Sequence, residues 1–222
     1  MRIRRGIVAY SAAVADLPLM LPGPYADALL GALDVEGKIP RALEALGPLA
    51  GRGVAVVGGG SRELADLAGV AGHVTRVSAP AGPGSLALGV PSESVDAVVA
   101  RWSAFDGADP RDLAEADRAL RPDGRLLVVH DYGRDDVSRL RGDLPAYGLW
   151  SRRDGPFLSA GFRIRVVHCF WTFASLEAMT AFLGGAFGEV GAGLAATLKR
   201  PRLSYNVAVY HRARGGAAQP TG

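Results

Sequence analysis

The segment VAVVGGGSRELADLAG, Val54 to Gly69, joins a strand pattern, a glycine turn and a helix pattern in one short stretch. Its first four residues are apolar without alternation, which is typical of a parallel strand covered on both faces. Three glycines follow, and Ser61 and Glu63 stand near the start of a helix that Gly69 closes. A strand that passes through a tight turn into a helix predicts an α/β domain.

Strand and helix patterns alternate through the rest of the chain. The residue patterns predict strands at 73–77, 95–100, 125–130, 162–168 and 203–210, and helices at 112–120 and 175–198. The interval between 78 and 94 is rich in turn residues and too short for a further strand–helix–strand unit. We therefore predict a Rossmann-like, doubly wound α/β fold with a mostly parallel sheet.

The chain divides into three predicted regions. Residues 1–50 contain helical patterns broken by Pro-Gly-Pro, and we expect an N-terminal helical cap or lid. The same apolar residues could instead form a homodimer contact. Residues 51–212 form the α/β domain, and residues 213–222 are expected to be a disordered tail.

The composition limits the classes of function. The chain has 222 residues, 49% of them hydrophobic and 21% charged, which is enough for a full core. The net charge is +3, and the basic residues are scattered among acids, so we expect no nucleic-acid partner. Cys169 is the single cysteine, which fits a reducing cytoplasm. No run of 18 apolar residues occurs, so no membrane span is expected.

Three blocks together resemble the class I S-adenosylmethionine-dependent methyltransferases. They are VAVVGGGS at 54–61, SVDAVVARWSAF at 94–105 and EADRALRPDGRLLVVHDY at 115–132. The third block is the closest and most specific match, and the resemblance spans residues 49–211. It implies a methyltransferase-type sheet that ends in an antiparallel strand. In this chain the third strand of that sheet is expected to be missing or short.

The resemblance also implies a binding site for S-adenosylmethionine at the carboxyl ends of the strands. The positions that correspond to cofactor-binding residues are Gly58, Gly59, Gly60, Ser61, Ser78 and Trp102. Trp102 could alternatively cover the end of the sheet. Glycines let the backbone approach a cofactor closely, and the following helix presents free N–H groups there.

The sequence departs from the family at the acids and at one glycine. Val56 stands at the first acid, Arg62 at the last glycine, and Ser78 at the acid that would bind the ribose. A hydrogen bond to a charged group contributes about 1.5–3 kcal/mol, so losing the ribose acid weakens binding by roughly one to two powers of ten. Two hypotheses follow: methyl transfer from S-adenosylmethionine to a small molecule, or a non-catalytic descendant that acts as a binding or scaffolding protein.

Polar and aromatic residues follow two of the predicted strands. Asp131 or His130 could accept a proton from the substrate, and Tyr132, His168 and Trp171 could bind it. The alternatives are that Asp131 caps a turn, that His130 ends its strand in a hydrogen bond, and that the aromatic residues pack against the C-terminal helix. Two histidines without a third ligand predict no metal site.

A second resemblance is confined to one short region. Residues 51–80 also resemble the opening of the NAD-dependent dehydrogenases of sirohaem synthesis, which share the Val-Val-Gly-Gly-Gly turn. Nothing later in the chain supports this family, and a lone glycine turn is weak evidence. A dehydrogenase is therefore kept as a minor alternative.

Overall fold

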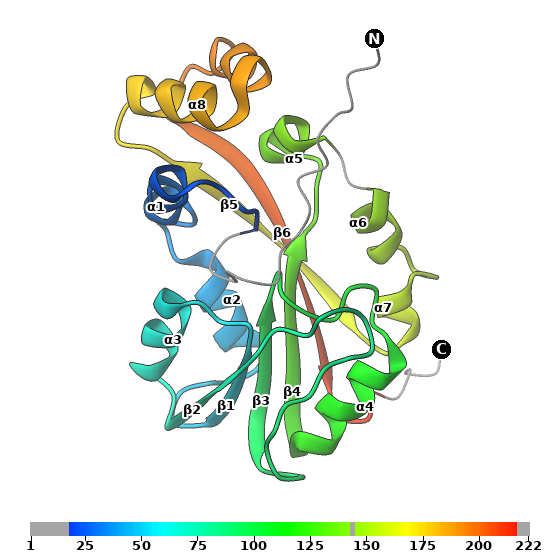
Figure 1. Ribbon diagram of the computed structural model, residues 1–222. Helices are drawn as coiled ribbons and strands as arrows, with labels where there is room; N and C mark the ends of the chain where they lie inside the picture. Colours follow the sequence, from blue (N-terminus) through cyan, green and yellow to red (C-terminus); the bar gives the residue numbers. More distant parts are fainter. Residues whose placement is uncertain (1–17, 143–144, 217–222) are drawn as a thin grey trace.

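The computed structural model describes residues 18–142 and 145–216, and its centre is a six-stranded sheet (Figure 1). The strand order is β2-β1-β3-β4-β6-β5. The first four strands are parallel, and β6 runs antiparallel to both β4 and β5. The strands are β1 (Gly53–Val57), β2 (His73–Val77), β3 (Val95–Arg101), β4 (Leu120–Asp131), β5 (Arg163–Thr172) and β6 (Arg202–Ala213).

This order confirms the predicted fold class. A doubly wound sheet has the order 3-2-1-4-5-6, and β2-β1-β3-β4 corresponds to its strands 2-1-4-5. Within the described residues no strand lies beyond β2, where the third strand would be. The sheet ends in antiparallel strands, as the sequence predicted. The missing third strand is the main departure from the ordinary doubly wound plan.

An extended segment, residues 78–94, takes the place of the missing strand and its helix. The buried carboxylate of Asp112 accepts hydrogen bonds from the N–H groups of Gly84, at 2.8 Å, and Leu86, at 2.9 Å. Leu86 and Leu88 are buried in the core on that face. The omitted strand is thus replaced by a segment that a helix side chain fixes.

Helices cover both faces of the sheet (Figure 1). They are α1 (Gly23–Ala32), α2 (Lys38–Leu46), α3 (Ser61–Ala68), α4 (Pro110–Ala119), α5 (Asp136–Arg141), α6 (Pro145–Trp150), α7 (Pro156–Ser159) and α8 (Leu176–Ala195). The sequence predicted most of them but not α5 or α6. Asp109 and Ser175 cap α4 and α8 by accepting backbone N–H bonds, which explains where these helices begin.

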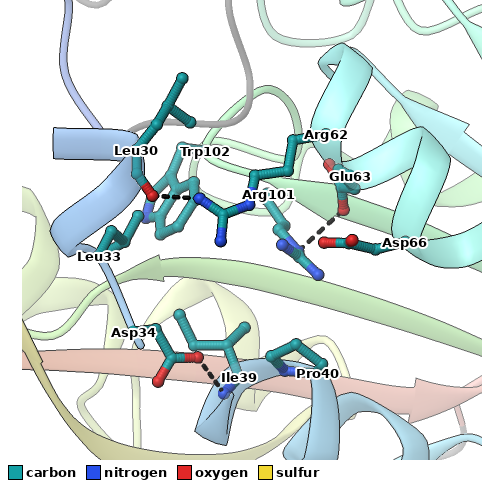
Figure 2. Close-up of a pocket in the computed structure, with 10 residues that line it drawn as sticks. All are labelled: Leu30, Leu33, Asp34, Ile39, Pro40, Arg62, Glu63, Asp66, Arg101 and Trp102. Carbon is teal, nitrogen blue, oxygen red and sulfur yellow. Dashed lines mark hydrogen bonds and ion pairs between the residues drawn. The ribbon is translucent and has the colours of Figure 1, made fainter. Parts of the chain in front are cut away.

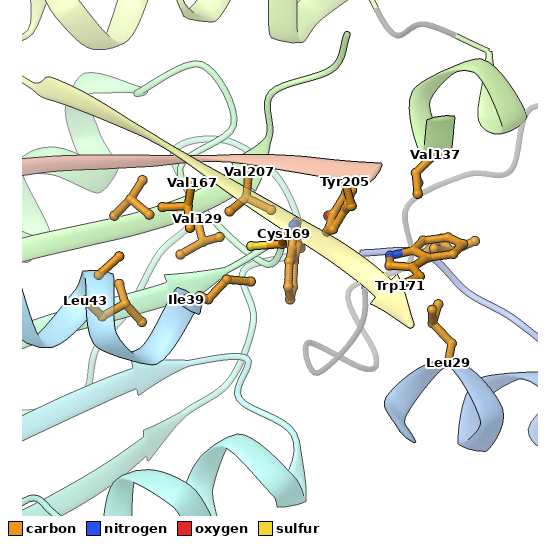
Figure 3. Packing of buried hydrophobic residues seen from close by; sticks show 14 of the residues in the cluster. Leu29, Ile39, Leu43, Val129, Val137, Val167, Cys169, Trp171, Tyr205 and Val207 are labelled. Atoms are coloured by element: carbon orange, nitrogen blue, oxygen red, sulfur yellow. The ribbon is translucent and has the colours of Figure 1, made fainter. Parts of the chain in front are cut away.

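Two hydrophobic cores lie on opposite faces of the sheet. One face packs against α1, α2, α3, α5 and α8, and the other against α4 and α7. Figure 3 shows Ile39 and Leu43 of α2 facing the side chains of Val129, Val167 and Val207. Each fully buried side chain of this size contributes about 1.5–3 kcal/mol. The alternation of side chains along each strand therefore decides which face a polar residue reaches.

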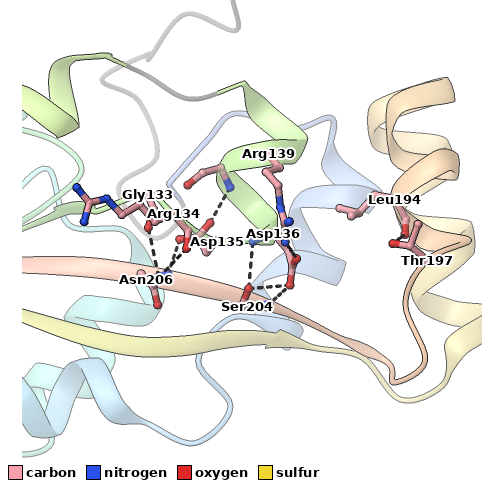
Figure 4. A network of polar contacts seen from close by, with 10 residues as sticks. Gly133, Arg134, Asp135, Asp136, Arg139, Leu194, Thr197, Ser204 and Asn206 are labelled. Atoms are coloured by element: carbon pink, nitrogen blue, oxygen red, sulfur yellow. Dashed lines mark hydrogen bonds and ion pairs between the residues drawn. The ribbon is translucent and has the colours of Figure 1, made fainter.

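A polar network fixes α5 to β6 (Figure 4). Asp135 accepts hydrogen bonds from the N–H groups of Ser138 and Asn206, both at 2.7 Å. Asp136 accepts from the hydroxyl of Ser204 at 2.7 Å. Burial raises the pKa of the Asp135 carboxyl above its ordinary value, although both N–H donors favour the charged form. Nothing in the local sequence indicates that an acid at this position is buried.

Two boundaries differ from the predictions. The residues Arg121-Pro122-Asp123-Gly124 predict a turn; they lie inside β4, where the register with β3 shifts. Strand β6 runs to Ala213, and the N–H of Gly215 donates to Asp117 at 3.1 Å, so ordered structure continues past the predicted start of the tail. Residues 1–17 of the cap or lid predicted for 1–50, and residues 217–222 of the tail predicted for 213–222, lie outside the described residues.

Helix α8 is unusually apolar for its exposure. By length and composition alone it could cross a membrane, with a mean hydropathy of 1.2 and 28% of it buried. It is kinked at Gly188 and packs Met179, Phe182 and Leu183 into the core. One such helix is weak evidence for a membrane span.

Candidate ligand crevice

The strand order reverses between β1 and β3. The chain moves from β1 to β2 on one side and later returns to β3 on the other side of β1. In open α/β sheets, ligands bind beyond the carboxyl ends of the strands at such a point. Gly58 follows β1 and Trp102 follows β3, so both predicted cofactor-binding positions reach this crevice.

The glycine turn is packed by the chain itself. Gly58 has a φ of +66°, and a Cβ there would lie 2.7 Å from the Cβ of Ser103 and 3.1 Å from that of Ala79. The Ser103 hydroxyl donates to the carbonyl oxygen of Val57 at 2.6 Å. Glycine at 58 is therefore required by backbone conformation and internal packing, without any ligand.

The other loop positions are divided between the core and solvent. Gly59 is buried, and a Cβ there would lie 2.5 Å from the Cγ1 of Val56. Gly60 is the N-cap residue of α3 and forms no side-chain cap, and Ser61, the first helical residue, is exposed. Ser78, after β2, is also exposed and offers a hydroxyl where the related enzymes carry an acid.

A buried ion pair joins the start of α3 to the end of β3. Arg101 Nε lies 2.8 Å from Glu63 Oε1, and the Glu63 side chain is fully buried while that of Arg101 is 12% exposed. From the sequence, Arg101 could meet an acidic substrate or pair with Asp106 or Asp109; the predicted pairing is wrong, because the tertiary structure brings α3 against the end of β3. Asp109 instead pairs with the neighbouring Arg111.

The first hollow of the crevice is an open space of about 460 Å³ between α1, α2 and α3 (Figure 2). Arg62 reaches across it and donates to the carbonyl oxygen of Leu30. Side chains of both charges line this hollow: the basic Arg62 and Arg101, and the acidic Glu63 and Asp66. The lining residues are Leu30, Leu33, Asp34, Ile39, Pro40, Arg62, Glu63, Asp66, Arg101 and Trp102.

The second hollow, of about 510 Å³, lies on the other side of Trp102. Trp102 is common to both hollows, whereas Gly58, Gly59 and Gly60 line neither. The second hollow is lined by Pro80, Ala81, Gly82, Pro83, Trp102, Ser103, Ala104, Phe105, Asp106 and Asp112.

The loop after β3 holds several residues in a strained backbone conformation. Trp102 has a φ of +52°, and Phe105 and Ala108 also have positive φ. Each such non-glycine residue costs on the order of 1–3 kcal/mol, and strain of this kind clusters at ligand sites. Trp102 is buried, and its indole N–H has no acceptor among the described residues. A buried donor without a partner is a position where a ligand acceptor would be stabilised.

Asp131 and His130, the predicted bases, point to opposite faces of the sheet because they are adjacent in β4. Asp131 is buried, pairs with the Arg141 guanidinium and accepts a hydrogen bond from the Tyr205 hydroxyl. Arg141 also donates to the carbonyl oxygen of Pro18 at 3.2 Å. These contacts give Asp131 a structural role that its position at a strand end did not reveal.

His130 is held in a pocket of aromatic rings. Its Nε2 lies 3.1 Å from the carbonyl oxygen of Ala104, which can only accept, so Nε2 carries a hydrogen. Burial lowers the pKa of this imidazole, although Asp106 at 3.7 Å acts in the opposite direction. The neutral ring is thus favoured. The surrounding rings are those of Tyr147, Trp150 and Phe157.

The predicted substrate-binding residues are divided by the sheet. His168 is exposed, and its Nδ1 lies 2.8 Å from the Asn206 side-chain oxygen, while the Tyr132 N–H donates to the Asn206 carbonyl oxygen. Trp171 lies on the opposite face of β5, fully buried against Phe182 of α8. For Trp171, this is the packing role that the sequence offered as an alternative.

No metal cluster is found in the described part of the chain, where no three His, Cys, Asp or Glu side chains lie together. Burial raises the pKa of the Cys169 thiol, which therefore stays protonated. Within the described residues, the crevice therefore gains neither a metal site nor a reactive thiolate from these side chains.

The crevice fits S-adenosylmethionine only in part. The start of α3 and the buried Trp102 N–H could receive the carboxylate end of such a molecule. Ser78 cannot replace an acid that binds both ribose hydroxyls, and Ser103 packs on the face of Gly58 where the chain turns. Glu63, Arg62 and Ser103 were not selected from the sequence as site residues. For Arg62 and Glu63, the only signal in the sequence was their position directly after the glycine turn.

No protein-family model matches the sequence, and no curated protein matches it. Several solved structures are similar in fold. One is a proposed type II methyltransferase from Anaeromyxobacter dehalogenans, with 20% identity, a TM-score of 0.48, and coverage of 88% of this chain and 98% of the other. A proposed methyltransferase of Haloferax volcanii, in complex with the Trm112 methyltransferase activator, has 19% identity, a TM-score of 0.47, and coverage of 78% and 89%.

A third similar structure is an S-adenosylmethionine-dependent methyltransferase from Aquifex aeolicus, with 14% identity and a TM-score of 0.44. The matched region covers 80% of this chain and 93% of the Aquifex aeolicus chain. The predicted resemblance to the class I methyltransferase fold is confirmed. The strand order and the antiparallel end of the sheet carry this assignment.

Proposed function

We propose that this chain is a methyltransferase-fold protein that binds a small polar molecule and does not transfer a methyl group. The observation that carries the proposal is the contact of Ser103 with Gly58, reinforced by the Ser103 hydrogen bond to Val57. This contact ties the end of β1 to the loop after β3. In related folds the methyl donor lies between the ends of these strands, whereas here the two segments contact each other.

The groups proposed for proton transfer are also engaged. Asp131 is paired with Arg141 and accepts a hydrogen bond from Tyr205, and the His130 ring is enclosed by aromatic side chains. A general base must reach the proton that it abstracts. Neither side chain lines one of the two hollows. This arrangement supports a binding role over a catalytic one.

The lining of the first hollow supports one class of ligand. The Arg62 guanidinium favours a carboxylate, and Asp66 favours an ammonium group, while Arg101 is already paired with Glu63. The unpartnered Trp102 N–H adds a further donor. A molecule with both charges, such as a free amino acid, matches this lining.

A second candidate function is methyl transfer from S-adenosylmethionine to a small molecule in the cytoplasm. The glycine turn that leads into the start of α3 is the observation that favours it. The bound donor would supply an electrophilic methyl group. On this candidate, Arg62 and the start of α3 would bind the donor's carboxylate, and Trp102 would exclude water beside it.

Calorimetric titration and thermal shift of the full chain separate the two functions. The ligands are S-adenosylmethionine, its demethylated product and a panel of free amino acids. We expect an amino acid to bind, with at least a tenfold loss in Arg62→Gln and little change in Arg76→Gln, an exposed arginine on β2. Failure of the whole panel at about millimolar concentration would overturn the binding role.

Tight binding of S-adenosylmethionine, below about 100 µM, would establish the second candidate instead. The variant Ser78→Asp restores the missing acid at an exposed position. If the absence of this acid alone prevents the binding of S-adenosylmethionine, Ser78→Asp gains roughly one to two powers of ten in affinity for it. Ser92→Asp, at another exposed serine, is the matched control.

A further inference from the structure

Four basic side chains gather on one face of the sheet at the end opposite to the crevice. Arg163 of β5 is directly opposite His211 of β6, and Arg165 follows two residues along the same strand. The direct partner of His211 in β4 is Leu127, so Arg125, two residues before Leu127, lies diagonally across from His211. We call these four residues the basic row. Residues that face each other in antiparallel strands share a face, so all four project together.

The basic row concentrates positive charge at the start of β5. Burial lowers the pKa of His211, and the guanidinium groups of Arg163, Arg125 and Arg165 lower it further, so the neutral imidazole is favoured. Neither Arg125 nor Arg165 forms an ion pair with an acid in the described part of the chain. An anionic partner would be attracted by the charge of these arginines.

The strand that carries two of these residues is at the edge of the sheet. Strand β5 pairs with β6, and its last part is covered, because Leu33 bridges Trp171 and the Lys38 ammonium donates to the carbonyl oxygen of His168. Within the described residues, the part from 163 to 167 has no strand on its outer side. Unpaired N–H and C=O groups of an edge strand can bind another extended segment.

We propose that an acidic, extended segment of a partner protein docks here as an added strand beside residues 163–167. Alternate side chains of a strand lie about 6.6–6.8 Å apart on one face, which matches acids of the segment to Arg163 and Arg165. Carboxylates accept paired hydrogen bonds from guanidinium groups. The neighbouring side chains of Leu127, Val167 and Val209 on this face are aliphatic. Single-stranded nucleic acids instead use aromatic stacking platforms, which the row lacks.

The proposal is independent of the crevice and is tested by peptide binding. The probe is a fluorescent peptide of alternating Glu and Thr, followed by anisotropy at low salt with the full chain. We expect binding that weakens as salt rises, and at least a tenfold loss in the double variant Arg163→Gln/Arg165→Gln. The matched control, Arg152→Gln/Arg153→Gln, removes the same charge from an exposed loop and should change the affinity less than twofold.

Two further arms separate the alternatives. A peptide with Gln in place of Glu, and one with N-methylated backbone groups, should both bind at least tenfold more weakly. Equal losses in both double variants would reduce the effect to non-specific attraction and overturn the proposal. Tighter binding of a single-stranded DNA oligonucleotide, or no peptide binding at about 1 mM, would also overturn it. So would self-association of Arg163→Gln/Arg165→Gln with unchanged peptide affinity, because the arginines would then only protect the edge.

Discussion

Arg101 and Glu63 form a buried ion pair, with 2.8 Å between Nε and Oε1, that joins the end of β3 to the first turn of α3. The acid lies two residues after the start of that helix, where a negative charge also interacts favourably with the helix dipole. The pair thus fixes the two elements that form one wall of the first hollow. It is a structural contact at the place where a ligand is expected.

Removing one partner of this pair should be costly. Glu63→Gln leaves the Arg101 charge largely buried, and breaking a buried pair typically costs about 3–5 kcal/mol. We expect a similar loss for Arg101→Gln, and a smaller loss for the double variant Glu63→Leu/Arg101→Met than the sum of the single changes. Urea denaturation measures all three. Additive losses would show that the two side chains are not coupled.

Gly58→Ala should destabilise the fold through both conformation and packing. A left-handed φ costs a residue with a side chain roughly 1–2 kcal/mol, and the new Cβ would meet Ser103 at 2.7 Å. Gly37→Ala is the matched control, because Gly37 has a φ of +64° with nothing near its missing Cβ. We expect Gly58→Ala to lose more stability than Gly37→Ala. Ser103→Gly should recover part of the difference, and equal losses would exclude the packing contact.

Asp131→Asn should act on stability. The change removes the negative charge that pairs with Arg141 and accepts from Tyr205, so we expect a loss of about 2–4 kcal/mol in the free energy of unfolding. Tyr205→Phe should lose about 1–2 kcal/mol. Chemical denaturation gives both values. A stable Asp131→Asn variant that has lost a methyl-transfer activity would instead identify Asp131 as a catalytic base.

The fold should become less stable as the pH falls below about 6.5. The pKa values of His130 and His211 are lowered in the folded chain, mainly by burial. The unfolded chain therefore binds more protons than the folded one in this range, so the free energy of unfolding decreases on acidification. Denaturation at pH 7.5 and pH 5.5 measures the decrease. His211→Asn should reduce it, and an unchanged stability between the two pH values would contradict the prediction.

The order of local elements followed from the sequence. The helix at 61–68 and the strand at 73–77 lie where the residue patterns predicted them. Continuous apolar runs identified the buried strands, because a strand covered on both faces requires apolar side chains on both. Helices α5 and α6 were missed because each is short and lacks a long periodic pattern. Residues 121–124, where a turn is predicted, have no partner in β3, because β3 pairs with Leu120 and then from Arg125 onward.

The sequence alone thus determined that a glycine turn lies between a buried strand and a helix, and that the acids of a donor site are absent from it. The three-dimensional structure decided what surrounds that turn. It brought Ser103 against Gly58, Arg101 against Glu63 and Arg141 against Asp131, pairs that lie 10 to 45 positions apart in the chain. Such contacts depend on which strands are neighbours and which face each side chain reaches. Local sequence patterns fix neither of these, because both are set by packing across the sheet.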